Sequence, residues 1–117
     1  SPIKENLLSI TELAKLRQVT SETLRYYDRI GLITPDYVDP QTRYRYYSIR
    51  QYEKLGTIKE LRQLGMSIHD ITDYFSGRNL RKSHQLLLHQ LELLEEEIRK
   101  QQLLSEILRR KLHFLSE

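Results

Sequence analysis

The chain has 117 residues, enough for one small domain with an appendage but not for a large enclosed catalytic cleft. Its 19 basic and 16 acidic residues give a formal charge of +3, an excess too small to identify a polyanionic partner by itself. The absence of cysteine excludes disulfides and thiolate metal sites, and the absence of a long apolar run excludes a membrane span, so we expect a cytoplasmic protein.

The first two predicted helices are short and separated by a tight turn. Ser9 and Glu12 have the spacing of a capping box, and apolar residues at helical spacing follow, so we predict a helix from Ile10 to Arg17. Thr20 is a suitable N-cap for a second helix, which runs to Ile30 and is stopped by the following glycine. Two short helices joined in this way are typical of a helix-turn-helix.

A β-hairpin is predicted next. The β-prone segments Ile33–Val38 and Arg43–Tyr47 flank Asp39–Thr42, a four-residue stretch with turn chemistry. On a strand, alternation would place Arg43 and Arg45 on one face and the neighbouring tyrosines on the other. The hairpin therefore has the form of a basic wing.

Two further helices complete the predicted domain. Ser48 to Gln51 has the pattern of a second capping box, and Ser67 is a suitable cap for a helix from Ile68 to Phe75. The expected inward residues of these two helices are Tyr52, Leu55, Ile58, Leu61, Leu64, Ile71, Tyr74 and Phe75. The sequence thus predicts a mainly α fold, with a winged helix-turn-helix domain over residues 7–79.

One long helix is predicted over residues 80–117, because neither proline nor glycine interrupts this segment. Its apolar residues recur at spacings of three and four, as in a coiled coil, so we expect a dimerisation helix. The seam consists of Leu87, Leu91, Leu94, Ile98, Leu108, Leu112 and Leu115. Gln101 and Ser105 interrupt it with polar side chains, which can fix a register or mark a crossing point. The alternative is an amphipathic helix folded back on its own domain.

No segment has the pattern of a catalytic or metal site. The four histidines are scattered without an HExxH motif, and the four glycines form neither a GxGxxG motif nor a phosphate-binding loop. We therefore expect neither enzymatic activity nor a cofactor.

The pattern instead favours DNA binding. The second helix of a helix-turn-helix lies in the major groove with its N-terminal half toward the base edges. The side chains so placed are Thr20, Ser21, Thr23, Arg25 and Tyr26. Arg43 and Arg45 of the wing, with Lys59 and Arg62 of the third helix, are expected to contact phosphates from the same surface. Taken singly, each arginine could serve solubility alone and each tyrosine could simply fill the core.

Four segments resemble the MerR family of bacterial transcription regulators. They are Leu8–Lys15, Val19–Leu32, Tyr44–Ser48 and Leu64–Ser67. The motifs Arg-Tyr-Tyr-Asp and Tyr-Arg-Tyr-Tyr-Ser, in this order, are highly specific. The wing segment Pro35–Pro40 is most similar to that of multidrug-responsive members.

The resemblance implies a homodimer, joined by an antiparallel coiled coil, on double-stranded promoter DNA. Such regulators bind a pseudo-palindromic operator in an overlong promoter spacer and activate RNA polymerase by bending and untwisting that spacer. By motif position, the resemblance assigns DNA contacts to Thr20, Arg25, Tyr26, Tyr44, Arg45, Lys59 and Arg62. Arg43 departs from the glycine common at its position, which changes the expected geometry of the wing.

The resemblance also bears on what the chain senses and how complete it is. Metal-sensing relatives use cysteines at the end of the long helix, and this chain has none. Drug-sensing relatives carry a ligand domain after that helix, so we expect a DNA-binding and dimerisation fragment, with a naturally short regulator as the alternative. Because no methionine opens the chain, Ser1 to Ile3 are interpreted as the remnant of a cleaved tag.

A second function remains open from the residues alone. A coiled-coil adaptor could use the winged domain to bind protein rather than DNA. Replacing Arg25 or Arg45 separates the two hypotheses, because only the first predicts a loss of promoter binding with the dimer intact.

Overall fold

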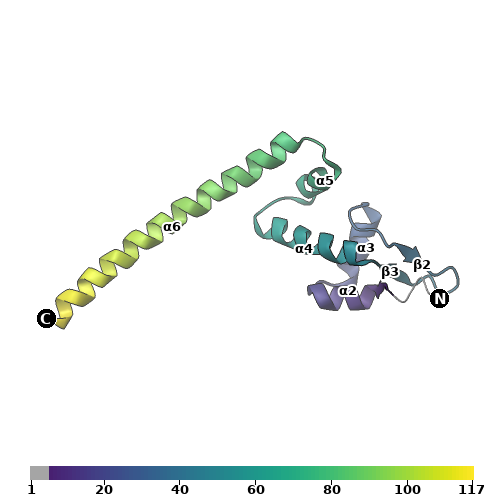
Figure 1. The fold of residues 1–117 in the computed structure, drawn as a ribbon, viewed down its shortest axis with the longest axis horizontal. Helices are drawn as coiled ribbons and strands as arrows, with labels where there is room; N and C mark the ends of the chain where they lie inside the picture. Colours follow the sequence, from purple (N-terminus) through teal and green to yellow (C-terminus); the bar gives the residue numbers. More distant parts are fainter. Residues whose placement is uncertain (1–5) are drawn as a thin grey trace. The chain divides into compact units, whose positions relative to one another are not determined.

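The computed structural model describes residues 6–117, so the residues interpreted as a tag remnant, Ser1 to Ile3, lie outside the described part. The chain divides into two compact units, the first ending at Thr72 and the second starting at Asp73 (Figure 1). The first unit contains the two helices of the helix-turn-helix, a small sheet and the helix that follows the sheet. The second unit consists mainly of one long helix.

The first two helices have the predicted bounds and caps. α2 spans Ile10–Arg17 and begins at a complete capping box, in which the Glu12 N–H donates to Ser9 Oγ at 3.1 Å and the Ser9 N–H donates to Glu12 Oε1 at 2.8 Å. These hydrogen bonds from Ser9 hold the pKa of the Glu12 carboxyl below its usual value. α3 spans Ser21–Arg29 with Thr20 as its N-cap, and the chain leaves it through the left-handed Gly31.

The core of the first unit is formed by apolar side chains from every helix and from the wing. Within residues 6–117, the large side chains that are fully buried are Leu13, Leu24, Ile33, Tyr47, Leu55, Ile58 and Ile71. Leu13 and Leu24 belong to the two helices of the helix-turn-helix, and Leu55 and Ile58 to α4, which spans Ile49–Gln63. The core therefore fixes the helix-turn-helix against α4, as the inward face predicted for α4 requires.

The wing belongs to an antiparallel sheet with the order β1-β3-β2. β3 (Arg45–Tyr47) lies between β2 (Tyr37–Val38) and β1 (Leu8–Ser9). In this register Leu8 faces Tyr47, and Tyr37 and Val38 face Tyr46 and Arg45. The sequence analysis missed β1, because a two-residue strand joined to a helix cap has no recognisable alternation.

The predicted four-residue hairpin loop is wrong, because the strands are shorter than expected and residues 39–44 connect them. The exposed loop is organised by the buried Asp39, whose carboxylate accepts from the backbone N–H groups of Gln41 and Thr42, at 2.9 and 3.2 Å. The Arg43 N–H donates to the Asp39 carbonyl at 2.8 Å, and Arg43 takes a left-handed φ of 66°. Arg43 and Arg45 therefore do not share a strand face, contrary to the alternation argument.

The second predicted capping box, at Ser48 and Gln51, is also wrong. Ser48 is the N-cap residue of α4, but its side chain makes no capping hydrogen bond. Its N–H donates instead to Asp36 Oδ2 at 2.7 Å, which removes the group that Gln51 would have bound. Within the described residues, Ser48 Oγ and Gln51 Oε1 are buried without a hydrogen-bond partner. A long-range contact from the wing has replaced the local cap.

α5 spans Ile68–Ser76, at the boundary of the two units, and begins at the predicted cap. The Asp70 N–H donates to Ser67 Oγ at 3.1 Å. Ile71 is buried as predicted, whereas Tyr74 and Phe75 are only half-buried and pack edge to face, with ring centroids 5.2 Å apart. The expectation that both aromatic side chains are buried is therefore wrong for the single protomer.

The second unit contains α6, a single helix over Leu80–Ser116. Asn79 caps it by accepting from the Lys82 N–H at 3.2 Å. Leu87 is half-buried, and the remaining apolar seam residues, Leu91, Leu94, Ile98, Leu108, Leu112 and Leu115, are each at least 50% exposed in the single protomer. Among the described residues, no helix combines the length and apolar character needed to cross a membrane.

Candidate nucleic-acid interface

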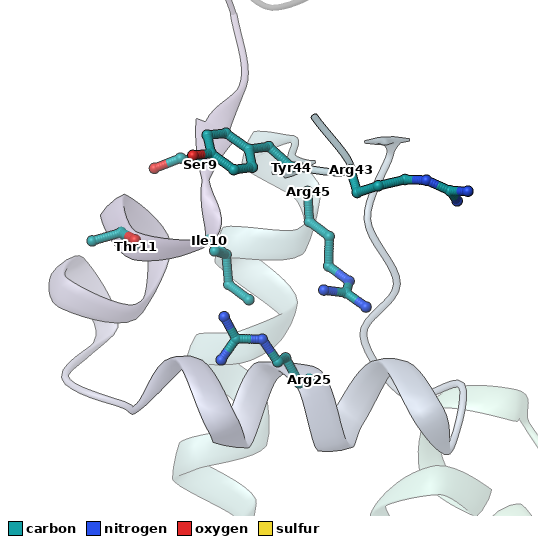
Figure 2. A pocket seen from close by; sticks show the side chains of 7 residues that line it. All are labelled: Ser9, Ile10, Thr11, Arg25, Arg43, Tyr44 and Arg45. Carbon is teal, nitrogen blue, oxygen red and sulfur yellow. The ribbon is translucent and has the colours of Figure 1, made fainter. Parts of the chain in front are cut away.

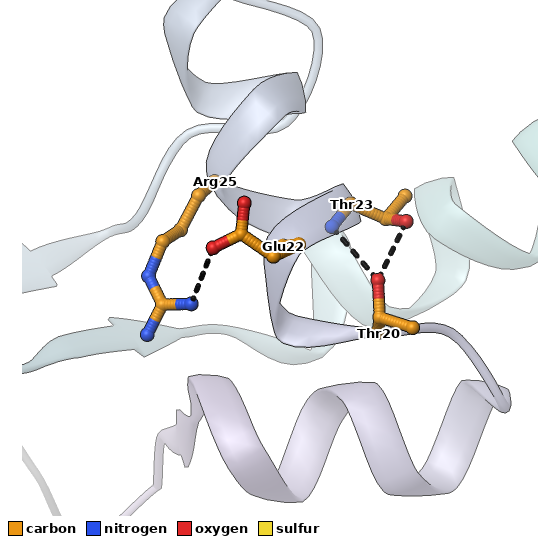
Figure 3. Close-up of polar contacts among 4 residues, drawn as sticks. All are labelled: Thr20, Glu22, Thr23 and Arg25. Carbon is orange, nitrogen blue, oxygen red and sulfur yellow. Dashed lines mark hydrogen bonds and ion pairs between the residues drawn. The ribbon is translucent and has the colours of Figure 1, made fainter.

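The N-terminus of α3 carries the first group of predicted contact residues. The Thr23 N–H donates to Thr20 Oγ1 at 3.0 Å, and the two threonine hydroxyls lie 2.9 Å apart in the same cap (Figure 3). The exposed Thr20 thus has its orientation fixed by the helix it starts. Ser21 and Thr23 are half-buried one and three residues further on. Hydroxyl groups and the positive end of the helix dipole meet here, an arrangement that suits a phosphate.

Arg25 lies one turn further along α3, beside Glu22. Its guanidinium is 3.4 Å from Glu22 Oε1, and the arginine side chain is 43% exposed (Figure 3). An exposed pair at this distance is weak, because water screens it. Glu22 therefore orients Arg25 without preventing it from turning to a stronger anion.

The wing is tied to α3 by an ion pair that the sequence analysis did not anticipate. Arg45 Nε donates to Asp28 Oδ2 at 3.1 Å, and both side chains are partly exposed. This contact joins β3 to the helix that presents Arg25. The Asp in the Arg-Tyr-Tyr-Asp motif thus positions the wing arginine.

Residues of α3 and of the wing, together with residues at the start of α2, line one hollow in the surface. Its lining consists of Ser9, Ile10, Thr11, Arg25, Arg43, Tyr44 and Arg45. Figure 2 shows Arg25 rising from α3 and Arg45 extending from β3 toward the same space, while Arg43 points away from it. Tyr44 is 66% exposed beside them. The structure therefore brings together the predicted arginines of the recognition helix and the wing, and it adds the hydroxyls of Ser9 and Thr11.

The predicted α4 residues do not line this hollow. Lys59 lines a separate hollow with Arg17 and Gln18, and its ammonium donates to the Arg17 carbonyl at the end of α2. Arg62 is exposed and donates to the Met66 carbonyl at 3.4 Å. Of the five cations expected on one surface, Arg25, Arg43 and Arg45 line the hollow of the wing. That Lys59 and Arg62 share this surface stays a prediction.

A second arginine contact, absent from the sequence prediction, fastens α2 to α4. Arg17 Nε donates to the Tyr52 carbonyl at 2.9 Å, and the guanidinium lies 3.7 Å from the centre of the Tyr52 ring. Gly56 makes room for it, because a Cβ there would be 2.7 Å from the guanidinium carbon. Nothing local in the sequence indicates this contact, since the residues are 35 and more positions apart.

The tyrosines of the middle segment include two that are buried and two that are exposed. Tyr47 and Tyr27 are buried, and burial raises the pKa of each phenol above its usual value. Tyr26 and Tyr44 are 41% and 66% exposed. Tyr26 lies beside Arg29, whose guanidinium carbon is 5.7 Å from the ring centre. The buried pair supports the interface from below, and the exposed pair can contact a partner.

The family model for MerR HTH family regulatory proteins matches residues 8–78. The multidrug-efflux transporter 1 regulator of Bacillus subtilis is 45% identical over 69 residues, which are 59% of this chain and 25% of that protein. The transcriptional regulator BrlR of Pseudomonas aeruginosa is 36% identical over 105 residues, 86% of this chain and 39% of that protein.

Solved structures lead to the same group of proteins. The cryo-EM structure of the EcmrR–DNA complex in EcmrR-RPo matches with a TM-score of 0.62 and 32% identity, over 93% of this chain and 38% of that one. The present chain therefore spans less than half the length of each of these relatives. The matches identify homology to transcriptional regulators rather than to enzymes.

Proposed function

Because the chain belongs to the MerR HTH family, we propose that it is a sequence-specific transcriptional regulator that binds promoter DNA as a homodimer. The observation that carries the proposal is the hollow toward which Arg25 of α3 and Arg45 of the wing both extend. Two guanidinium groups from different elements, directed into one space, suit the phosphates of a DNA backbone beside a major groove. A solved structure of 32% identity is itself a DNA complex.

The proposed contacts follow from the position of each side chain. Thr20, Ser21 and Thr23 bind phosphate or base edges from the start of α3, and Arg25 reads a guanine or holds a phosphate. The wing contributes Arg43, Tyr44 and Arg45, and Tyr26 adds its exposed ring. Lys59 and Arg62 contact phosphates from α4, outside the hollow. The proposal assigns DNA binding to residues 7–79.

The same proposal assigns dimerisation to residues 80–117. Six of the seven seam residues are at least half exposed in one protomer, so a second copy of the helix would remove the apolar segments on both sides of Gln101 and Ser105 from water. As a dimer, the protein would place two recognition helices on a two-fold symmetric operator within the promoter. Bending and untwisting an overlong spacer there would align the promoter elements for RNA polymerase. The proposal places this activity in the cytoplasm.

The proposal is tested by replacing one arginine at a time. Arg25→Ala and Arg45→Ala should each weaken binding to the regulator's own promoter by about 10-fold to 100-fold, the cost of one good base or phosphate contact. Arg99→Ala, on the exposed face of α6, is the matched control and should bind as the unmodified protein does. Binding is measured by fluorescence anisotropy against a scrambled duplex of equal length, and dimerisation by sedimentation.

The salt dependence supplies a second measurement on the same variants. Several phosphate contacts per protomer predict a steep fall in affinity as salt rises, and loss of one phosphate contact reduces the slope by about one. Unchanged promoter affinity in both variants, with the dimer intact, would contradict the proposal and favour the protein-binding adaptor.

A further inference from the structure

Glu22 occupies the middle of the outward face of α3. Leu24 and Tyr27 of this helix are buried in the core. At about 100° per residue, their mean direction lies almost opposite Glu22, whose side chain is 79% exposed. Arg25 lies one turn away on the same face. If α3 enters a major groove as proposed, its outward face meets the base edges, and the Glu22 carboxylate lies among them.

A carboxylate among base edges is unfavourable unless it finds a hydrogen-bond donor. The phosphates repel it, and an ionised group that is desolvated and left unpaired costs free energy. In the major groove, the donors are the exocyclic amines of cytosine and adenine, and the other polar groups accept. Glu22 therefore restricts the base that α3 can face, whereas the hydroxyl groups of Thr20 and Thr23 suit donors and acceptors alike.

Within the protein, Glu22 is paired with the guanidinium of Arg25. Glu22 Oε1 lies 3.4 Å from Arg25 Nη1, and Figure 3 shows the two side chains directed toward one another. Arg45, the other guanidinium directed into the hollow, is paired with Asp28 at 3.1 Å. Each arginine thus has its own carboxylate. A pair that is weak in water becomes stronger when a bound duplex excludes the solvent around it.

Resting on the proposed binding of promoter DNA, we propose that Glu22 and Arg25 together read one G·C base pair. Arg25 donates to O6 and N7 of the guanine, and Glu22 accepts from the N4 amine of the paired cytosine. The contact between the two side chains persists in the complex. Glu22 is then a specificity-determining residue, because it requires a donor at the base beside the guanine.

The spacing of the two side chains matches the edge of this base pair. Guanine O6 and cytosine N4 share a base-pair hydrogen bond and lie about 2.9 Å apart. A donor directed at O6 and an acceptor directed at N4 therefore stand about 3 Å apart, close to the 3.4 Å between Arg25 Nη1 and Glu22 Oε1. The edge presents two acceptors followed by a donor, and the side chains present donors followed by an acceptor.

Other partners lose part of this match. An A·T pair presents its amine between two acceptors, so Arg25 keeps one acceptor instead of two neighbouring ones. A phosphate bound by Arg25 brings a second anion beside the Glu22 carboxylate, and the two like charges repel. Guanine is therefore the partner of Arg25 that the neighbouring Glu22 favours.

Removal of a single amine from the DNA tests the cytosine contact. The full chain first selects its half-site from duplexes in which a two-fold symmetric sequence is randomised. Each cytosine of one half-site is then replaced by 2-pyrimidinone, an analogue that lacks only the exocyclic amine. At one of these positions the affinity of the wild type, measured by fluorescence anisotropy, should fall about tenfold, whereas Glu22→Ala should bind both duplexes equally.

The matched control is Glu53→Ala, which removes the same charge from an exposed position on α4. It should show the wild-type loss at the same cytosine. Because the Glu22 side chain is exposed, its replacement should leave the fold intact, which circular dichroism checks.

Removal of a guanine acceptor tests whether a single base pair is read. An analogue with carbon in place of N7, set opposite the sensitive cytosine, should weaken binding by the wild type but not by Arg25→Ala. If the wild type is instead sensitive only at guanines of other base pairs, the shared reading by Glu22 and Arg25 is overturned.

The outcomes separate this inference from the proposed function. Equal losses for the wild type and Glu22→Ala at every cytosine overturn the role of Glu22 and leave promoter binding standing. Equal tightening of Glu22→Ala on selected and scrambled duplexes does the same, because Glu22 then acts only by repulsion. A wild-type protein that binds selected and scrambled duplexes alike overturns the inference and the proposed sequence-specific regulator together.

Discussion

Arg43 is the residue at which sequence and backbone geometry disagree most clearly. Its φ of 66° lies in the left-handed region, where a Cβ crowds the following carbonyl and costs about 1–2 kcal/mol. The turn around Asp39 imposes this conformation, because the Arg43 N–H donates to the Asp39 carbonyl. The exposed side chain points away from the hollow (Figure 2). The backbone conformation disfavours an arginine at this position, so the property that the residue contributes is its positive charge.

We therefore expect Arg43→Gly to raise the free energy of unfolding by about 1 kcal/mol, because glycine adopts this φ without strain. Arg43→Ala is the matched control, since it removes the same charge and keeps the Cβ. Urea unfolding at a fixed protein concentration compares the two. Equal stability of both variants would show that the loop relaxes around Arg43, and the strain argument would fail.

At the scale of elements, the junction between α2 and α4 rests on long-range contacts of Arg17. The guanidinium donates to the Tyr52 carbonyl, stacks on the Tyr52 ring and fills the space above Gly56. Lys59 adds a contact to the carbonyl of the same arginine. Glycine inside a helix costs about 1 kcal/mol relative to alanine, so this close approach gives a reason for Gly56 in the middle of α4.

The effects of Gly56→Ala and Arg17→Ala should consequently be coupled. With Arg17 present, the new methyl group displaces the guanidinium, and the loss of its contacts offsets the gain in helix propensity. In the Arg17→Ala background the same change should stabilise the protein by about 1 kcal/mol. A double-mutant cycle by urea unfolding gives the coupling. An identical effect of Gly56→Ala in both backgrounds would mean that Arg17 does not occupy this space in solution.

At the scale of the whole molecule, operator binding and dimerisation are expected to be linked. One winged domain presents a single α3, whereas a symmetric operator offers two half-sites, so joining two domains multiplies the affinity through effective concentration. The α6 seam supplies the join in the proposed function. This link does not depend on the register in which the helices pair.

Ile98→Asp combined with Leu108→Asp should yield a monomer, because the dimer would bury two carboxylates per helix in the seam. We expect its operator affinity to fall by about 100-fold or more, and its binding to become insensitive to five base pairs inserted between the half-sites. Leu103→Asp, on the outer face, is the control and should retain dimerisation and DNA affinity. A monomeric double variant with undiminished operator affinity would refute the link.

Much of the fold was predictable because its signals are local. The caps at Ser9, Thr20 and Ser67, together with the left-handed glycines, define helix ends through contacts within four residues, and each was confirmed. The grouping of Arg25 with the wing arginines was anticipated from the order of the motifs.

The sequence by itself therefore determined the helices and their order. It also identified the outward-facing residues that are candidates for binding DNA and for contacting a second copy of the chain. Only the tertiary structure decided the β1–β3 pairing, the loss of the Ser48 cap to Asp36, the left-handed Arg43, and the two arginine contacts to Asp28 and Tyr52. The physical reason is distance along the chain. Each of these features, apart from the turn at Arg43, joins groups a dozen or more residues apart, and such contacts form only after the core has placed the elements side by side.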